Sequence, residues 1–415
     1  MNSRERVLKS INHQEPDRVP IDLGGTPQTG ISAIAYHNLK QHLGIKEGHT
    51  RIYDLMQQLA YPEEDILERF NVDTFDIGRS FNTNDEDWRD VKVNGIPAQF
   101  PTWFKSEFNE DGSLDILHPD GTKLAGMSEA ALVIDQTYYP CEDGLPQDIN
   151  ELLAVMQKNF GFVLVSPPFD HLTERGFWKT LKKNVASLRE NVDRALVFSS
   201  SVSFFQFGTI LKPMDKFLVD MIRHPQKMDK FLDVILDFQL TSLSMSCKAI
   251  GNLVDVINFG DDYGENKGPI FSPRLFRKFI KPRLEEACDY VKKHSNMKIF
   301  MHSCGSIVPI IPDLIEVGID ILNPVQINAK GMDPKFLKDT YGEDLTFWGG
   351  GADTRNVLPF KSPEEVKAHV KELLEIFAPG GGFVWNTVHN ILPDVSPENI
   401  VAMFDAIKEF NNEYY

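Results

Sequence analysis

A regular alternation of short apolar runs and longer amphipathic stretches occupies the second half of the chain. The stretches between the runs, among them 228–251, 272–294 and 362–378, repeat their apolar residues at helical spacing. The runs are typical of buried parallel strands and lie at 195–202, 253–262, 297–304, 318–326, 344–353 and 381–390, with two more at 17–26 and 73–81. Eight strand–helix units predict a (β/α)8 TIM barrel, and a doubly wound open sheet is the alternative.

The first part of the chain carries additional elements. Residues 3–13 predict a short N-terminal helical extension, and helices are also expected over 31–44 and 51–70. From about 82 to 145, short extended pieces are separated by Asn-Gly, Asp-Gly and Pro-Asp-Gly, which mark hairpin turns. We therefore expect one TIM-barrel domain over residues 1–415 with a β-rich insertion at about 82–145.

Composition limits the classes of partner. The net charge of −17 disfavours nucleic acid, because phosphate binding needs clustered lysine and arginine. No run of 18 apolar residues is present, and the first twenty residues lack the apolar core of a signal peptide, so we expect a cytoplasmic protein without a membrane span. The four scattered cysteines are typical of reduced thiols. A homodimer is possible, and the sequence leaves the oligomeric state open.

The segment FMHSCGS at 300–306 contains the strongest chemical signal. Residues i and i+2 of a strand point to the same side, so His302 and Cys304 face one space at the active end of a barrel strand. His389 ends the last strand and is the third candidate. An imidazole, a thiolate and a second imidazole form a suitable catalytic zinc site with one open position. The alternatives are a buried core cysteine, and a histidine that caps the loop or contacts substrate.

Other polar or aromatic residues also end the predicted strands. We expect substrate contacts from Asp22, Asn323, Gln326, Trp385 and Asn386, although Trp385 is equally suited to the core. Asp261 and Asp262 are candidates, together with His389, for proton transfer or substrate orientation. Adjacent strand residues point to opposite sides, so at most one of the two acids enters the site. Gln326, either acid or Glu265 could supply a weak fourth metal ligand.

Several long stretches resemble the uroporphyrinogen decarboxylase superfamily over nearly the whole chain. They are DRVPIDLGG, FGDDYGENKGPIFSPRLFRKFIKPRL, KIFMHSCGSIVPIIPDLIEVGIDILNPVQ and GGFVWNTVHNILPDVSPENIVAMFDAI. The resemblance implies a TIM barrel. Decarboxylases of this superfamily carry an arginine-rich RQAGR loop after the first strand, where this chain has DLGGTPQTG. Its cobamide-dependent methyltransferases hold zinc with an H-x-C pair and a cysteine ending the last strand. The pair matches His302 and Cys304, whereas the third position is His389.

The histidine in place of cysteine affects the expected reaction. Two imidazoles and one thiolate leave a net positive charge on zinc, which favours polarisation of an ether oxygen. The resemblance therefore implies a zinc-dependent methyltransferase that moves a methyl group from an O-methyl, methoxy-aromatic donor to a corrinoid. No D-x-H-x-x-G motif is found, so we expect the corrinoid on a separate protein. The alternatives are methylation of a thiol by a methyl-corrinoid, metal-free decarboxylation of a small acid, and a non-catalytic binding protein.

Overall fold

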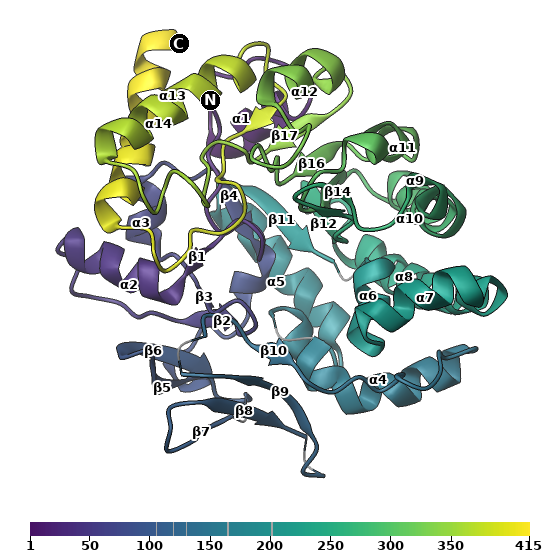
Figure 1. Cartoon of the computed structure of the whole chain (residues 1–415). Coiled ribbons are helices and arrows are strands. Elements are labelled where there is room, and N and C mark those ends of the chain that lie inside the picture. Colours follow the sequence, from purple (N-terminus) through teal and green to yellow (C-terminus); the bar gives the residue numbers. More distant parts are fainter. Residues whose placement is uncertain (105, 119, 130, 164–165, 201) are drawn as a thin grey trace.

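Seven parallel strands form one curved sheet in the computed structural model, which describes residues 1–104, 106–118, 120–129, 131–163, 166–200 and 202–415 (Figure 1). Each strand pairs with the next one in the sequence, as expected for repeated strand–helix units. The strands are β4 (Thr74–Asp76), β11 (Ala195–Ser199), β12 (Val256–Gly260), β15 (Lys298–His302), β16 (Ile321–Asn323), β17 (Thr346–Trp348) and β18 (Phe383–Val384).

A short segment around Ile21 joins the two edges of this sheet. On one side, the Trp385 N–H donates to the Pro20 carbonyl at 2.8 Å and the Asp22 N–H donates to the Trp385 carbonyl at 2.9 Å. On the other side, the Asp73 N–H donates to the Ile21 carbonyl at 2.7 Å. The segment is thus the eighth strand position of a closed ring. The predicted TIM barrel is confirmed, and the open doubly wound alternative is wrong.

Helices surround the barrel and follow its strands (Figure 1). Several begin with a serine cap followed by proline; Ser396, for example, accepts the Asn399 N–H. None of the described helices has the length and apolar character required to cross a membrane. The helices are α2 (Ala33–His42), α3 (Glu64–Arg69), α4 (Ile149–Val163), α5 (Phe177–Asn191), α6 (Phe205–Leu211), α7 (Met214–Arg223), α8 (Pro225–Ile250), α9 (Pro273–Leu275), α10 (Lys281–His294), α11 (Ile311–Glu316), α12 (Pro334–Tyr341), α13 (Pro363–Phe377) and α14 (Pro397–Tyr414), with the shorter turns η1 (Ile77–Ser80), η2 (Asp85–Asp87), η3 (Phe169–His171), η4 (Phe276–Ile280) and η5 (Val308–Ile310).

The predicted N-terminal extension is helix α1 (Ser3–Ser10), which packs against the barrel interior. Val7 and, just beyond the helix, Ile11 belong to the same buried cluster as the inward side chains of the barrel strands, such as Val197 and Phe300. Because this cluster is separate from the larger core between the strands and the outer helices, α1 covers the N-terminal end of the barrel.

The region expected to be β-rich contains a hairpin and a small sheet. The hairpin turns at Asn94 and Gly95, which both have positive φ, as a two-residue turn of this sequence favours. The elements are β5 (Trp88–Val93) with β6 (Ile96–Pro101), and then β7 (Glu107–Phe108), β8 (Leu114–Leu117), β9 (Lys123–Met127) and β10 (Asp135–Gln136) in one antiparallel sheet. The division of the chain into a single domain with this insertion stays a prediction.

The helix predicted over 51–70 is wrong in its first half. The chain forms β2 (Ile52–Asp54) and β3 (Leu59–Ala60), with β3 paired to both β2 and β1 (Ile31–Ser32), and only α3 is helical. Two further short strands, β13 (Gly264–Glu265) and β14 (Gly268–Pro269), follow β12. Long-range pairing overrides the local helical spacing here, because Ile31 also forms a parallel bridge with Ile391 in the loop after the last barrel strand.

The inward face of the barrel changes character toward the C-terminal ends of its strands. The buried interior cluster contains Val197, Val256, Phe300, Ile321 and Val384. Residues two positions later share their side of each strand. Those residues are the polar Ser199, Asn258, His302, Asn323 and Asn386. A polar layer therefore lies above an apolar one, at the end of the barrel where active sites of this fold are found.

Candidate metal centre

Three potential metal ligands meet at this end of the barrel. His302 ends β15, Cys304 follows two residues later, and His389 lies in the loop after β18. One ligand atom from each of the three side chains can be chosen so that all lie within 4.8 Å of one another. The Sγ atom of Cys304 is 3.5 Å from Nε2 of His302, and the two imidazole ring centres are 5.3 Å apart. The predicted residues are thus brought together.

The orientation of His302 follows from its hydrogen-bonding partner. Nδ2 of Asn323 donates to the Trp348 carbonyl at 2.6 Å, so the side-chain oxygen of Asn323 faces the other way as an acceptor. Nδ1 of His302 lies 2.6 Å from that oxygen and must therefore carry the proton. In the neutral ring this leaves the electron pair on Nε2, which faces Cys304; this is the form of histidine that binds metals.

His389 adopts a left-handed backbone conformation with φ of +66°, in a loop that is tied down on both sides. The Val388 N–H donates to the Ala352 carbonyl at 2.9 Å, and the Asn390 side-chain oxygen accepts the Gly30 N–H at 2.6 Å. Burial, together with the neighbouring His302, lowers the pKa of His389 to about 4. The His389 ring is therefore neutral at pH 7 and able to act as a ligand.

Cys304 is held by its backbone. Its N–H donates to Oδ1 of Asp262 at 2.8 Å, and the next N–H, from Gly305, donates to Oε1 of Gln326 at 2.8 Å. Gly305 has φ of +88°, and a Cβ there would lie 2.3 Å from a backbone atom of Gly264, so only glycine fits. Burial and the Asp262 carboxylate raise the pKa of the Cys304 thiol, which means that metal binding must displace its proton.

The donor set fits zinc. Bond lengths of about 2.3 Å to sulfur and about 2.05 Å to nitrogen at tetrahedral angles place the two donors about 3.6 Å apart. The observed separation of Cys304 Sγ and His302 Nε2 is 3.5 Å. Two nitrogen ligands of one zinc lie about 3.3 Å apart by the same geometry. His389 lies within the wider 4.8 Å limit, so its loop has to close slightly for all three residues to bind.

The two adjacent acids have different environments. Asp261 is buried, and its oxygens accept the N–H groups of residues 204, 205 and 206 and the Tyr263 hydroxyl. Burial raises the pKa of Asp261 to about 6, and its contacts fix the start of α6 rather than face the ligands. Asp262 is partly exposed, and its Oδ1 lies 3.6 Å from Nε2 of His302. Of the two, only Asp262 reaches the metal ligands.

Four of the five residues expected to bind substrate lie in the barrel opening or its polar layer. Asn323 and Gln326 support the ligands through the contacts described above, and the amide nitrogen of Gln326 donates to Asn266 at 2.8 Å. Asp22 and Asn386 belong to the inner polar layer: Asp22 accepts the indole N–H of Trp348 at 2.7 Å, and Asn386 donates to the Asp22 carbonyl.

Trp385 is not brought to the site. Its ring packs outside the barrel against Phe404 of α14, with ring centres 5.5 Å apart, and its indole N–H donates to the Gly351 carbonyl at 3.2 Å. The exposed Glu265, considered as a fourth ligand, is likewise not among the grouped ligands.

Two polar residues near the site were missed by the sequence analysis. Asp76 ends β4; its Oδ1 accepts the Gly78 N–H at 2.9 Å, and burial raises its pKa to about 7. Asn258 of β12 has a buried side-chain oxygen without a partner among the described residues, as does Asn386. The position of each residue at the end of an apolar run was the available signal.

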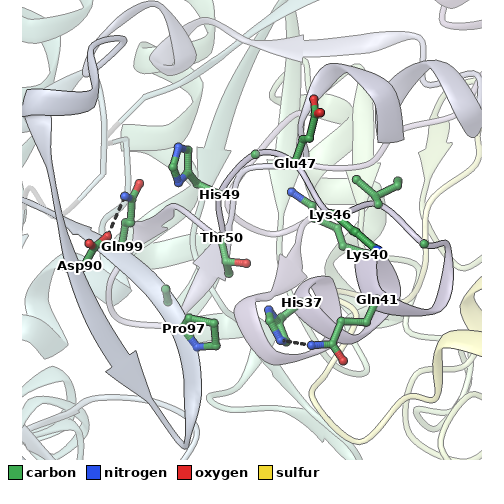
Figure 2. A pocket seen from close by; sticks show the side chains of 14 residues that line it. His37, Lys40, Gln41, Lys46, Glu47, His49, Thr50, Asp90, Pro97 and Gln99 are labelled. Carbon is green, nitrogen blue, oxygen red and sulfur yellow. Dashed lines mark hydrogen bonds between the residues drawn. The ribbon is translucent and has the colours of Figure 1, made fainter.

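A pocket of about 480 Å³ lies elsewhere, between the end of α2 and the β5–β6 hairpin (Figure 2). Its polar groups are partly paired: Gln41 donates to Nε2 of His37 at 2.7 Å, and Lys40 forms an ion pair with Glu63. No predicted site residue lines this pocket, which is therefore separate from the metal centre.

The chain is similar to known proteins in sequence and in fold. Matching curated sequences include the uroporphyrinogen decarboxylases of Magnetococcus marinus, 22% identical over 45% of this chain and 49% of that protein, and of Chloroherpeton thalassium, 24% identical over 46% and 51%. The chain thus spans about half the length of these relatives. A solved methyltransferase from Methanosarcina mazei superposes over 99% of both chains with a TM-score of 0.60 and 18% identity, which supports the fold.

The family match covers the part of the chain that contains the three candidate metal ligands. The sequence model for uroporphyrinogen decarboxylase (URO-D) matches residues 168–410, more than half of the chain, and this range includes all three grouped ligands. The closed barrel and the resemblance predicted from the sequence agree with that match. The chain belongs to the uroporphyrinogen decarboxylase family.

Proposed function

We propose that this protein is a zinc-dependent methyltransferase that moves a methyl group from a methoxy-aromatic donor to the cobalt of a corrinoid on a separate protein. The observation that carries the proposal is the grouping of His302, Cys304 and His389 within 4.8 Å at the C-terminal end of the barrel. Zinc held there would supply Lewis acidity beside the leaving oxygen. A cytoplasmic location and a homodimer also remain predictions.

In this reaction we assign roles to two residues next to the candidate ligands, Asn323 and Asp262. Asn323 fixes the tautomer of His302 and keeps its Nε2 available. The methyl carbon leaves the donor oxygen without its bonding electrons, so the oxygen becomes an anion that needs a proton or a positive neighbour. Asp262, partly exposed and 3.6 Å from His302, is placed to carry that proton at a carboxylate oxygen.

The composition of the ligand set favours an oxygen leaving group over a thiol acceptor. A neutral imidazole from His389 in place of a second thiolate leaves the centre more positive. Zinc held by these three residues would favour a departing phenoxide, whereas activation of a thiol as a nucleophile would benefit from a more electron-rich metal. Thiol methylation is therefore the less favoured of the two directions.

The first experiment is the metal content of the purified protein by mass spectrometry. About one zinc per chain is expected, with loss in Cys304→Ser and His389→Ala. Cys247→Ser and His37→Ala are matched controls, because Cys247 is a buried thiol of helix α8 and His37 a half-buried imidazole of helix α2. Zinc loss in Cys304→Ser alone would make His389 a substrate contact. Metal-replete protein without zinc would refute the proposal.

A second candidate function is metal-free decarboxylation of a small acid. It is favoured by the curated relatives, which are uroporphyrinogen decarboxylases, and by the buried Asp76, whose pKa is raised to about 7. Release of carbon dioxide from a carboxylate substrate by zinc-free protein, unaffected by Cys304→Ser, would select this function. Methyl transfer that depends on Cys304 would exclude it.

A further inference from the structure

A series of side-chain hydrogen bonds crosses the C-terminal end of the barrel, here called the inter-loop chain (Gln326, Asn328, Asp353 and Thr354). It begins at Gly305, whose N–H donates to Oε1 of Gln326 at 2.8 Å. The amide nitrogen of Gln326 donates to Oδ1 of Asn328 at 3.2 Å, and Nδ2 of Asn328 donates to Oδ1 of Asp353 at 2.9 Å. These residues follow β15, β16 and β17, so the chain joins three consecutive strand–helix units.

The far end of the inter-loop chain reaches the loop of the third candidate ligand. Thr354, which directly follows Asp353, is buried, and its hydroxyl donates to the Val388 carbonyl at 2.6 Å. Val388 precedes His389, and its own N–H donates to the Ala352 carbonyl at 2.9 Å. The loop after β17 therefore holds the backbone that carries His389.

The two ends of the chain fix which atom donates in each link. A backbone N–H can only donate, so the side-chain oxygen of Gln326 accepts from Gly305 and its nitrogen donates onward. Although burial opposes it, hydrogen bonding, mainly from Asn356, lowers the pKa of Asp353, so this carboxylate is ionised at pH 7. An ionised carboxylate can only accept, and the nitrogen of Asn328 must therefore face Asp353. All donors point toward one negative charge, which strengthens hydrogen bonds in series.

The inter-loop chain connects the ligands whose separation is not set by local geometry. His302 and Cys304 lie two residues apart at one strand end, with Nε2 and Sγ already 3.5 Å apart. His389 comes from a different strand–helix unit and lies within the wider limit of 4.8 Å. Contacts between loops must therefore fix its distance from the other two ligands.

We propose that Asn328 is a positioning residue that sets the distance of His389 from Cys304, and so determines whether a metal ion is held by three protein ligands or by two. Asn328 is the middle link of the chain and bridges the loops after β16 and β17. Without its side chain, Gln326 on one side and Asp353 on the other are no longer joined. The inference rests on the metal centre of the proposed function, and it is independent of the methyl donor and of the direction of transfer.

The test is the zinc affinity of Asn328→Leu and Thr354→Val, measured by competition with a chromophoric chelator. The two substitutions break the middle and the end of the chain, and each is expected to lower zinc affinity about 10-fold, as loss of an outer hydrogen-bonding partner does. Asn266→Leu is the matched control. Asn266 accepts from the same Gln326 nitrogen at 2.8 Å but follows β12, which lies on the opposite side of β15 from β17. The control is expected to keep its zinc affinity within about twofold.

A second comparison separates positioning from a general loss of stability. Asn328→Leu is combined with His389→Ala, and this double variant is expected to bind zinc no more weakly than His389→Ala alone, because the residue being positioned is already absent. Co2+ in place of zinc gives a visible spectrum that reports the number and geometry of the ligands. The spectrum of Asn328→Leu should move toward that of His389→Ala, whereas Asn266→Leu should keep the wild-type spectrum. Thermal denaturation of each metal-free variant checks that it is folded.

The outcomes separate this inference from the proposed function. Zinc in the wild type with unchanged affinity in both Asn328→Leu and Thr354→Val would overturn the positioning role and leave the methyltransferase proposal intact. An equal loss of affinity with and without His389 would show that Asn328 supports the fold alone, which also overturns the inference. Metal-replete wild-type protein that binds neither zinc nor Co2+ would refute the proposed function and this inference together.

Discussion

Replacement of Asn323 by leucine is expected to weaken zinc binding although Asn323 is not itself a ligand. Asn323 accepts the Nδ1 proton of His302 at 2.6 Å and donates to the Trp348 carbonyl at 2.6 Å. Leucine has a similar volume but neither polar group. His302 then loses the contact that fixes its tautomer and ring orientation, and Nε2 is free to turn away from Cys304.

The size of the effect follows from these two contacts. Loss of a hydrogen bond that orients a metal-bound histidine typically lowers metal affinity about 10- to 100-fold, or about 1.4–2.7 kcal/mol. The metal-free protein also loses stability, because the His302 N–H and the Trp348 carbonyl are left buried without partners, at about 1–3 kcal/mol each. Two separate measurements are therefore expected to change.

A competing chromophoric chelator measures the zinc affinity, and thermal denaturation of the metal-free protein measures stability. Asn399→Leu is the matched control, since Asn399 is also buried and its side chain donates to the carbonyls of Leu358 and Lys361 rather than to any of the three candidate ligands. The control is expected to lose stability and to keep its zinc affinity. Equal zinc affinities for Asn323→Leu and the control, within about twofold, would refute the role assigned to Asn323.

Three further predictions concern stability. Asp261→Asn is expected to cost about 1–3 kcal/mol in chemical denaturation and to speed hydrogen exchange at the start of α6, because an amide cannot accept all four bonds of the carboxylate; unchanged exchange there would contradict this. Ser362→Ala is expected to cost about 1 kcal/mol by loss of the α13 cap, with no effect on zinc content. Arg277 and Lys281 lower the pKa of Asp313, although burial opposes them. The Asp313 carboxylate therefore adds to the free energy of unfolding above about pH 4, and this contribution is lost as acid protonates the folded carboxylate. The difference in denaturation midpoint between wild type and Asp313→Asn should accordingly shrink below about pH 4.

Much of the barrel was predictable because its strands are buried on both faces. Such strands appear as continuous apolar runs, and the polar residue that ends each run marks the active end of the barrel. His302 and Cys304 were found in this way. His389 required the additional step that the last strand neighbours the first in a closed ring, and the contacts between Trp385 and Pro20 confirm that closure.

The strands β2 and β3, which carry Tyr53 and precede Tyr61, were not predictable from local pattern. The run that contains Tyr53 and Tyr61 has helical apolar spacing, so both tyrosines were expected on a helix. The run instead pairs with β1 through β3 and with Gln99 of β6 through Arg51, and a spacing rule cannot detect pairing between segments so distant in the sequence. Trp385 was expected to contact substrate, but it follows the inward-facing Val384 by one residue. Because side chains alternate between the two faces of a strand, this position already places Trp385 on the outer face.

The grouping of His302, Cys304 and His389 is difficult to explain as ordinary core packing. No described residue hydrogen-bonds either ring nitrogen of His389, and the free Nε2 of His302 meets only the weak thiol of Cys304 and the carboxylate of Asp262. Burial drives the pKa of His389 down to about 4, so the imidazole is held neutral without any hydrogen bond in return. A cluster that served packing alone would be more stable with apolar side chains at these positions. The same electron pairs become favourable when a cation accepts them, and the 3.5 Å spacing of sulfur and nitrogen already matches a tetrahedral zinc.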